Sequence, residues 1–337
     1  MSEPLRIGVL GAARIAGLSI VAPAAATGHR LVAVAARDPR RARGFAAEHG
    51  VERVHATYDD LLADADVEAV YNPLANALHG PWNERAVAAG KHVLAEKPFA
   101  ANAEEARRVA DAARAAGVVL LEAFHYPFHP LFARIDEIVG SGELGRVQRV
   151  EAVLRMPDPG PDDPRWSLEL AGGAVMDLGC YALHALRRLG LRHFGGEPTV
   201  RSATAEERVG GPGVDGRLTA ELAFPDGTPA VAGADMDSGG VWDFHLTVTG
   251  SAGTLHVPDF PRPHEDDSLT VRSADGTERV ERLGSRSSYT YQLEAFAAAV
   301  RGEQEPPYDV SDSVPQAELI DAVYAAAGLA PRPALTP

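Results

Sequence analysis

The sequence of 337 residues is poor in two reactive side-chain types, cysteine and lysine. Its one cysteine, Cys180, cannot form an intrachain disulfide and favours a reducing compartment, so we expect a cytoplasmic protein. Lys91 and Lys97 are the only lysines, and the other 30 of the 32 basic residues are arginines. A lysine that is retained in such an arginine-rich chain is a candidate functional residue.

Long apolar runs and excess positive charge are also missing. No stretch reaches the roughly 18 uncharged apolar residues that a membrane-spanning helix needs. The first residues lead directly into an expected strand, so we expect no signal peptide. The 47 acidic residues outnumber the basic ones and give a formal net charge of −15, which argues against nucleic acid or an anionic membrane as a partner.

What is present is the composition of an ordinary globular protein. Hydrophobic residues make up 45% of the chain and charged residues 23%. These values exclude collagen-like, disordered and small disulfide-stabilised proteins. The length alone predicts two domains.

The N-terminal part, up to about residue 120, alternates short apolar runs with alanine-rich helical stretches. Continuous apolar strands that are each followed by a helix indicate a parallel sheet covered on both faces. We therefore predict a doubly wound domain over residues 1–124. Its expected strands are residues 5–10, 31–36, 69–71, 92–95 and 118–121, and its expected helices are residues 15–26, 39–49, 58–64, 82–89 and 103–116.

The remainder, residues 125–337, has a different pattern. Many of its segments alternate apolar and polar residues, which predicts a large, mostly antiparallel, open sheet with one buried face. The fold class is thus α/β, with two domains. The expected strands of the second domain are residues 147–156, 200–206, 216–224, 230–236, 242–249, 254–257, 269–273 and 279–283, and its expected helices are residues 132–139, 173–189, 291–300 and 314–327.

The first strand runs into a glycine-containing turn and then a helix. Against the dinucleotide-binding pattern G-x-G-x-x-G/A, this segment has Gly11, Ala13 and Ala16. Backbone N–H groups of such a turn can face a pyrophosphate, so the candidate contacts are Gly11, Ala12, Ala13, Arg14 and Ile15. The alternative is a tight strand–helix turn that binds no ligand.

The end of the second strand bears on which dinucleotide is bound. Arg37 stands there, followed by Asp38 and by further arginines at positions 40, 41 and 43. An arginine at this place accommodates the 2′-phosphate of NADP, whereas an acidic residue binds the ribose of NAD. The order favours NADP, Asp38 keeps NAD possible, and the later arginines alternatively form a solvated helix face.

Lys97 follows the strand at residues 92–95, between Glu96 and Pro98. A lysine that ends a buried parallel strand points toward the crevice where cofactors bind, and its ammonium can donate a hydrogen bond to a substrate oxygen. The alternative is a surface lysine paired with Glu96.

The expected helix at residues 173–190 carries a polar stripe on an otherwise apolar surface. Asp177, Tyr181, His184 and Arg188 lie at helical spacing, which indicates water, a partner or an active site. The alternative is a partly buried helix whose tyrosine and histidine simply find hydrogen-bond partners. No group of His, Cys or carboxylate residues has metal-binding spacing, so we expect no metal.

These segments together resemble the Gfo/Idh/MocA oxidoreductases, a family that includes glucose–fructose oxidoreductase and inositol dehydrogenase. The resemblance covers nearly the whole chain and implies a Rossmann domain followed by an α/β domain with a large open sheet. Its most specific elements are residues 8–16 (GVLGAARIA), 72–79 (NPLANALH), 96–98 (EKP) and 172–181 (GGAVMDLGCY).

The resemblance also implies roles for single residues. Lys97 matches the family's catalytic lysine, Asp177 the aspartate beside it and Tyr181 the acid/base. Asn76, His79 and Glu96 match positions near the cofactor, and the second strand resembles the NADP-using dihydrodiol and xylose dehydrogenase branch. The candidate substrate-binding residues are Lys97, His125, Arg165, Asp177, Tyr181 and His184.

The leading hypothesis is an NADP-dependent oxidoreductase that transfers a hydride to or from a C–OH/C=O carbon of a sugar, sugar derivative or polyol. The resemblance further implies a homodimer or homotetramer. Two alternatives remain: a catalytically silent dinucleotide-binding regulatory protein of the same fold, and a dihydrodiol-type dehydrogenase.

Overall fold

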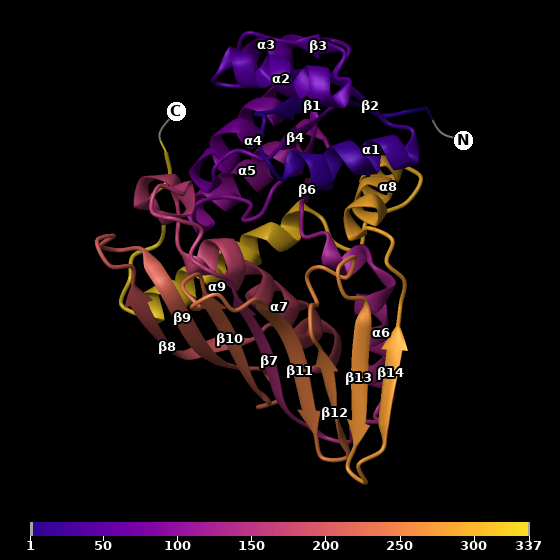
Figure 1. Cartoon of the computed structure of the whole chain (residues 1–337), viewed down its shortest axis with the longest axis vertical. Coiled ribbons are helices and arrows are strands. Elements are labelled where there is room, and N and C mark those ends of the chain that lie inside the picture. The colour runs from indigo at the N-terminus through magenta and orange to yellow at the C-terminus, as the bar shows by residue number, and fades with distance from the viewer. Residues whose placement is uncertain (1–2, 336–337) are drawn as a thin grey trace. The chain divides into compact units, whose positions relative to one another are not determined.

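The computed structural model describes residues 3–335, which form two compact units (Figure 1). Among these residues, the first unit comprises residues 3–125, 289–315 and 334–335. The second comprises residues 126–288 and 316–333. Each unit has its own sheet, as the two sequence patterns predict.

The sheet of the first unit has six strands, all parallel, in the order β3-β2-β1-β4-β5-β6. Its central strands are almost entirely buried, which explains their continuous apolar sequence. The predicted doubly wound architecture is confirmed; β3, a two-residue edge strand, was not predicted. The strands are β1 (Arg6–Leu10), β2 (Arg30–Ala35), β3 (Arg53–Val54), β4 (Ala69–Asn72), β5 (His92–Ala95) and β6 (Leu120–Glu122).

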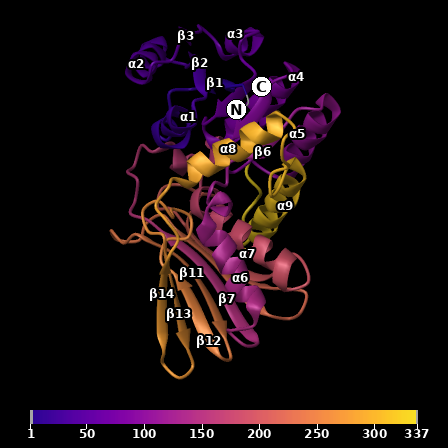
Figure 2. The same cartoon turned by 90° about the vertical axis from the view of Figure 1, so that its right-hand side faces the viewer.

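Helices cover both faces of this sheet. Figure 2 shows α4 and α5 on one side and α1 on the other. Two of the predicted helices are confirmed to the residue, and both begin at an Asx cap and end before a left-handed glycine. The helices are α1 (Ala22–Thr27), α2 (Pro39–His49), α3 (Tyr58–Ala63), α4 (His79–Ala88) and α5 (Ala103–Ala116).

The helix predicted over residues 15–26 is present, but it is not α-helical throughout. A π-helical turn at Gly17–Val21 precedes α1. In this turn the Ser19 hydroxyl donates to the carbonyl of Ile15 at 2.8 Å. Hydrophobic spacing does not distinguish such a turn from an α-helix of the same length.

A segment distant in sequence completes the first unit. It contains α8 (Ser288–Val300) and the start of α9 (Val310–Ala326). The hydroxyl of Tyr308 donates to the carbonyl oxygens of Glu122 at 3.1 Å and Phe124 at 2.5 Å. Arg301 pairs with Glu68 at 2.9 Å. These contacts explain why residues 289–315 group with the Rossmann sheet, although the sequence pattern alone places them in the second domain.

The second unit contains an eight-stranded sheet in the order β14-β13-β12-β11-β7-β10-β9-β8. All neighbours are antiparallel except β7 and β10, so the predicted mostly antiparallel sheet is confirmed. The strands are β7 (Val147–Arg155), β8 (Thr199–Glu207), β9 (Asp215–Ala223), β10 (Pro229–Asp235), β11 (Asp243–Gly250), β12 (Gly253–Val257), β13 (Ser268–Ser273) and β14 (Glu278–Arg282).

The two faces of this sheet differ. The helices α6 (Pro130–Ser141) and α7 (Cys180–His193) lie on one side, as Figure 2 shows, and α7 packs on β7 and β10. Side chains on that side are buried, among them Leu154, Phe244 and Leu246, whereas Glu151 and His245 on the other side are partly exposed. One face therefore forms the core and the other presents polar groups.

The described residues contain neither a membrane-spanning helix nor a cluster of metal-binding side chains. No helix between residues 3 and 335 is long and apolar enough to cross a membrane. Within the same range, no group of three or more His, Cys, Asp or Glu side chains is arranged to hold a metal ion.

Candidate functional site

The turn after β1 packs closely against neighbouring segments of the chain. Gly11 has φ +93°, a value that L side chains rarely adopt, and a Cβ there would lie 2.9 Å from Cδ2 of Leu74. The Gly11 N–H donates to Ala35 at the end of β2 at 2.7 Å. Arg41 in α2 reaches the same turn and donates to the carbonyl of Ala12 at 2.7 Å. Only glycine fits at position 11, as a phosphate-binding turn requires.

The end of β2 separates the roles of Arg37 and Asp38. The Asp38 carboxylate caps α2 by accepting from the Arg40 N–H at 2.8 Å. It also lies 3.5 Å from the Arg40 guanidinium. Arg37 is exposed at the carboxyl end of the strand. The acidic residue that kept NAD possible is thus used to start a helix.

Tyr58, which the sequence did not single out, lies in the same place. Its hydroxyl would be 3.8 Å from a Cβ at Gly11 and hydrogen-bonds the backbone of Arg37. Burial raises the pKa of Tyr58, although this bond and the charges of Arg37 and Arg41 oppose the shift. An aromatic hydroxyl therefore joins the phosphate-side turn to the end of β2.

Lys97 follows β5 on a strand end that is held by a buried hydrogen-bond chain. Tyr71 in β4 donates to Oε1 of Glu96 at 2.6 Å, and Ser19 lies 2.5 Å from the Tyr71 hydroxyl. The backbone N–H of Lys97 donates to Oε2 of the same carboxylate at 3.3 Å. Burial and the charge of Glu96 raise the pKa of Tyr71 well above its ordinary value, so Tyr71 is a permanent donor.

His79 joins two loops at the carboxyl edge of the first sheet. The ring is buried, with Nδ1 2.7 Å from the carbonyl oxygen of Pro98 and Nε2 2.8 Å from that of Leu74. Two such bonds require the doubly protonated ring, whereas burial lowers the pKa of His79 to about 4. At neutral pH the ring therefore carries one proton and donates to one of the two carbonyls. Asn76 begins the short 3₁₀ turn Asn76–Leu78 just before it.

The two lysines occupy different environments. Lys91 is buried, and its Nζ donates to the carbonyls of Asp64 and Val67, both at 2.8 Å. Burial lowers the pKa of Lys91. Lys97 is partly exposed at a strand end. Lys91 thus has a structural task, which leaves Lys97 as the lysine suited to chemistry.

In the second unit, the start of α7 is fixed against the sheet. A π-helical turn, Val175–Gly179, precedes the helix and contains Asp177. The Val175 N–H donates to the buried Asp215 carboxylate at 2.8 Å, and this carboxylate also pairs with Arg332. A Cβ on Gly173, whose φ is +129°, would collide with Asp215 and Arg332, and a Cβ on Gly172 would collide with the carbonyl oxygen of Arg165, which explains the glycine pair in the sequence.

Asp177 belongs to an ion cluster with Arg165. Nη1 of Arg165 lies 3.2 Å from Oδ2 of Asp177, and Nε donates to Oδ1 of Asp163 at 2.9 Å. Burial favours a lower pKa for Arg165, but the hydrogen bond with Asp163 and the charges of both aspartates raise it above the ordinary range. The guanidinium therefore stays charged and orients the Asp177 carboxylate.

Tyr181 and His184 differ in access. Tyr181 is partly exposed, and its ring lies 6.1 Å from the ring of Tyr126. His184 is buried, with Nδ1 2.7 Å from the Tyr126 hydroxyl. Sequence reasoning placed both on one polar stripe and did not identify Tyr126. In the first unit, His125 is also buried, and its ring stacks on Tyr289 at 3.7 Å.

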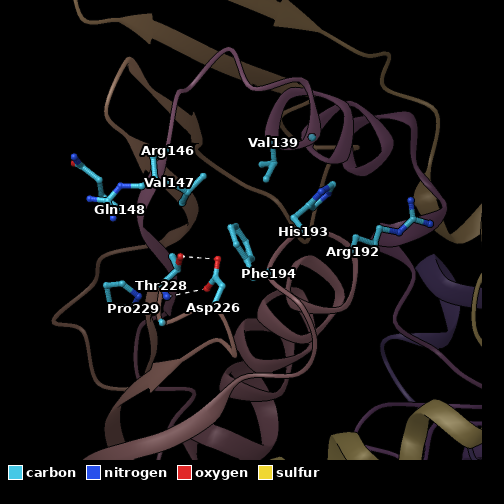
Figure 3. A pocket seen from close by; sticks show the side chains of 12 residues that line it. Val139, Arg146, Val147, Gln148, Arg192, His193, Phe194, Asp226, Thr228 and Pro229 are labelled. Carbon is cyan, nitrogen blue, oxygen red and sulfur yellow. Dashed lines mark hydrogen bonds between the residues drawn. The ribbon is translucent and has the colours of Figure 1, made fainter.

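A hollow of about 770 Å³ lies at the other end of α7 (Figure 3). Arg146, Val139 and His193 line it, and His193 also pairs with Asp136 at 3.2 Å. The 14 residues of α7 correspond to about 20 Å of helix, so this hollow is remote from Asp177 and Tyr181.

Comparisons with known proteins agree with this structure. Residues 5–124 match the family model for the oxidoreductase family with an NAD-binding Rossmann fold, and residues 132–256 match the GFO/IDH/MocA C-terminal domain. D-xylose 1-dehydrogenase (NADP⁺) 2 of Haloferax volcanii is 37% identical over 325 residues, covering 96% of this chain and 97% of that protein. A dTDP-3,4-didehydro-2,6-dideoxy-α-D-glucose 3-reductase of Streptomyces violaceoruber is 37% identical over 337 residues, covering 96% of each chain.

A solved structure shares the whole architecture. The 3-ketoreductase of Actinomadura kijaniata, in complex with NADP and TDP-benzene, superimposes with a TM-score of 0.88 at 30% identity. The match covers 96% of this chain and 98% of that one. The chain belongs to the Gfo/Idh/MocA family of oxidoreductases. It is an NAD(P)-dependent oxidoreductase with the family's Rossmann domain.

Proposed function

We propose that the protein is an NADP-dependent oxidoreductase that acts on a C–OH/C=O carbon of a sugar, a sugar derivative or a polyol. The main support is Lys97 at the carboxyl end of β5, where Tyr71 and Glu96 hold the strand end. Ligands of doubly wound folds bind at this edge of the sheet. Relatives named as xylose dehydrogenase and sugar 3-reductase support the substrate class.

The choice of NADP rests on the end of β2. Asp38 is engaged at the helix start, while exposed Arg37 and nearby Arg41 offer guanidinium groups for a 2′-phosphate. The residues proposed to contact the cofactor are Gly11, Ala12, Ala13, Arg14, Ile15, Arg37, Asn76, His79, Glu96 and Lys97. When bound, the nicotinamide supplies or accepts the hydride.

The proposed proton chemistry belongs to Tyr181. The oxygen on the reacting carbon gains or loses a proton as that carbon is reduced or oxidised, so a group that exchanges protons must be within hydrogen-bond reach. A free phenol titrates near pH 10, too high for this task without a neighbouring cation. We assign that cation to Lys97, which also polarises the oxygen, and assign orientation of a substrate hydroxyl to Asp177.

Nicotinamide absorbance during turnover tests the proposal. Purified protein is assayed with NADP⁺ and NAD⁺ over a panel of aldoses, polyols and aromatic dihydrodiols. We expect turnover of sugars with NADP⁺. Turnover of dihydrodiols alone supports the diol dehydrogenase instead, and tight binding of NADP⁺ without turnover of any compound supports the silent regulatory protein.

Assembly and location complete the proposal. We infer a homodimer or homotetramer that pairs through the polar face of the eight-stranded sheet, with about 2,000 Å² or more buried. Light scattering at micromolar concentration tests this, and a monomer contradicts it. The single cysteine, Cys180, which cannot form an intrachain disulfide, supports the cytoplasm as the site of action.

A further inference from the structure

Residues 316–332, which belong to the second unit, carry polar side chains that are almost completely buried. Gln316 and Tyr324 lie in α9 and Arg332 follows this helix, and each of the three is at most 1% exposed. Burying a polar or charged group costs free energy unless the group gains a partner, and apolar side chains would close a core at lower cost. The partners of these three side chains therefore indicate what the 316–332 segment does.

Arg332 and Tyr324 hold the buried Asp215 carboxylate at the start of β9. The Tyr324 hydroxyl donates to Oδ1 of Asp215 at 3.0 Å, and the Arg332 guanidinium pairs with the same oxygen. The guanidinium carbon also lies 3.9 Å from the centre of the Tyr324 ring. Burial raises the pKa of Asp215, and the charge of Arg332 is the largest opposing effect. Arg332 thus favours the ionised carboxylate, which only accepts hydrogen bonds.

The other oxygen of this carboxylate fixes the beginning of the turn that carries Asp177. Oδ2 of Asp215 accepts from the Val175 N–H at 2.8 Å, and Val175 is the first residue of the π-helical turn Val175–Gly179. Asp177 lies two residues further along the same turn. A carboxylate that is held by the 316–332 segment therefore sets the position of the backbone that bears Asp177.

Gln316 fixes the other end of this turn. Its Nε2 donates to the carbonyl of Cys180 at 3.0 Å, and Cys180 stands between the turn and Tyr181. Its Oε1 accepts from Nη1 of Arg187 at 3.3 Å. Because one partner is an acceptor and the other a donor, the amide has a single orientation. The 316–332 segment thus holds both ends of the turn, one directly and one through Asp215.

We propose that Arg332 and Gln316 are positioning residues that fix the turn Val175–Gly179, so that Asp177 and Tyr181 face the substrate in the geometry the reaction needs. Both residues are buried and act through the turn, not through contact with the substrate. A displacement of about 1 Å at a reacting group costs about a hundredfold in rate, so a turn held at both ends matters for turnover. This inference rests on the proposed function and deepens it.

The kinetic test compares wild type with Arg332→Gln, Arg332→Lys, Gln316→Ala and Tyr324→Phe, using NADP⁺ and the aldose that the wild type turns over fastest. We expect Arg332→Gln and Gln316→Ala to lower kcat by about 10- to 100-fold. Tyr324→Phe, which loses one hydrogen bond and keeps the ring, should lower it by about two- to tenfold. Arg332→Lys should recover part of the loss, because a positive charge remains beside Asp215. The dissociation constant of NADP⁺ should keep its wild-type value in all four variants.

Val271→Ala is the matched control for a general loss of stability. Val271 is buried in β13, which lies five strands from β9 in the sheet order, about 24 Å away. This variant should unfold more easily and keep the wild-type kcat at temperatures where it is folded. The inference is overturned if the folded Gln316 and Tyr324 variants keep the wild-type kcat, or if Val271→Ala loses as much kcat as they do. These two variants decide the question even if Arg332→Gln does not fold.

Hydrogen exchange separates failure of this inference from failure of the proposed function. Amide exchange in peptides covering residues 173–184 and 268–282, followed by mass spectrometry, needs no turnover. Faster exchange in Gln316→Ala and Tyr324→Phe that is confined to residues 173–184 supports the positioning role even if the wild type oxidises no sugar, in which case the proposed function fails. Exchange that is unchanged, or that is accelerated equally in both peptides, refutes the positioning role even if sugars are turned over.

Discussion

The six-stranded sheet of the first unit is buried on both faces, whereas the eight-stranded sheet of the second unit has one face covered by helices and one polar face. In the first sheet, candidate functional groups are restricted to the carboxyl ends of strands, because the faces are occupied. In the second, they stand at the start of α7. We therefore expect substitutions in the two units to have different effects on activity and stability.

The largest effect is expected from the two lysines of the first unit. Lys97→Ala should reduce kcat by more than about 10⁴ with little change in the unfolding midpoint, because it removes the polarising charge from the substrate oxygen. Lys91→Ala should instead leave kcat of the folded protein little changed and lower the free energy of unfolding by about 1–3 kcal/mol, since two buried carbonyls lose their donor. Steady-state kinetics and chemical denaturation of both variants check this pair.

Tyr181→Phe should lower kcat by about 10²–10⁴, the usual contribution of general acid–base catalysis. Binding of NADP, measured by fluorescence titration, should survive. Wild-type turnover in this variant together with loss of turnover in His184→Ala would identify His184 as the proton donor instead.

Asp215→Ala tests the anchor beneath the start of α7. It removes the buried partner of Arg332 and the acceptor for Val175, so the free energy of unfolding should fall by about 3–5 kcal/mol. Equilibrium denaturation in urea measures the change, and the exposed Asp226→Ala is a control of the same chemical type. A loss below about 1 kcal/mol means that Asp215 does not anchor the helix.

Arg37→Ala should weaken NADP binding by about 1.5–3 kcal/mol, the value of a charge-assisted hydrogen bond, and leave NAD binding nearly unchanged. Titration with each nucleotide measures the difference. Equal losses for both nucleotides contradict the assignment of the 2′-phosphate to this side chain.

The smallest effect concerns pH and strand β14. The side-chain hydrogen bond with Arg134, supported by Arg279, lowers the pKa of Glu281 to about 2. Because this pKa is depressed on folding, its stabilisation is present above the unfolded value, about 4.3, and is lost as pH falls toward 2. After solvent screening we expect about 1 kcal/mol. The stability difference between wild type and Glu281→Gln, followed from pH 7 to pH 2, should shrink toward zero.

Much of the fold could be predicted because local signals coincide with tertiary structure. Helices α2 and α5 each have an Asx residue at the start and a glycine after the end, so their limits were readable. Strand β3 has two residues and no periodicity to detect. The π-helical turns and the grouping of residues 289–315 with the first sheet depend on contacts between residues far apart in sequence.

The candidate site likewise contains residues that the sequence could predict and residues that it could not. Lys97, Asp177 and Tyr181 stand out because a charge or hydroxyl interrupts an apolar pattern or matches a motif. The tyrosines that support them do not stand out. Tyr71 lies in a buried strand and resembles a core aromatic, and its role depends on Ser19 and Glu96, which are remote in sequence. The periodicity of apolar residues predicts which side chains are buried, but it does not predict which group a buried hydroxyl hydrogen-bonds.

The contrast between the two lysines has a practical consequence for chemical labelling. An amine-selective acylating reagent meets two lysine side chains, and the Nζ of Lys91 is buried between two carbonyl oxygens. Modification of side chains will therefore concentrate at Lys97. The extent of labelling of the tryptic peptide that contains Lys97 therefore measures how accessible the candidate catalytic amine is. A decrease in this labelling when nucleotide is added would show that the nucleotide is bound near Lys97.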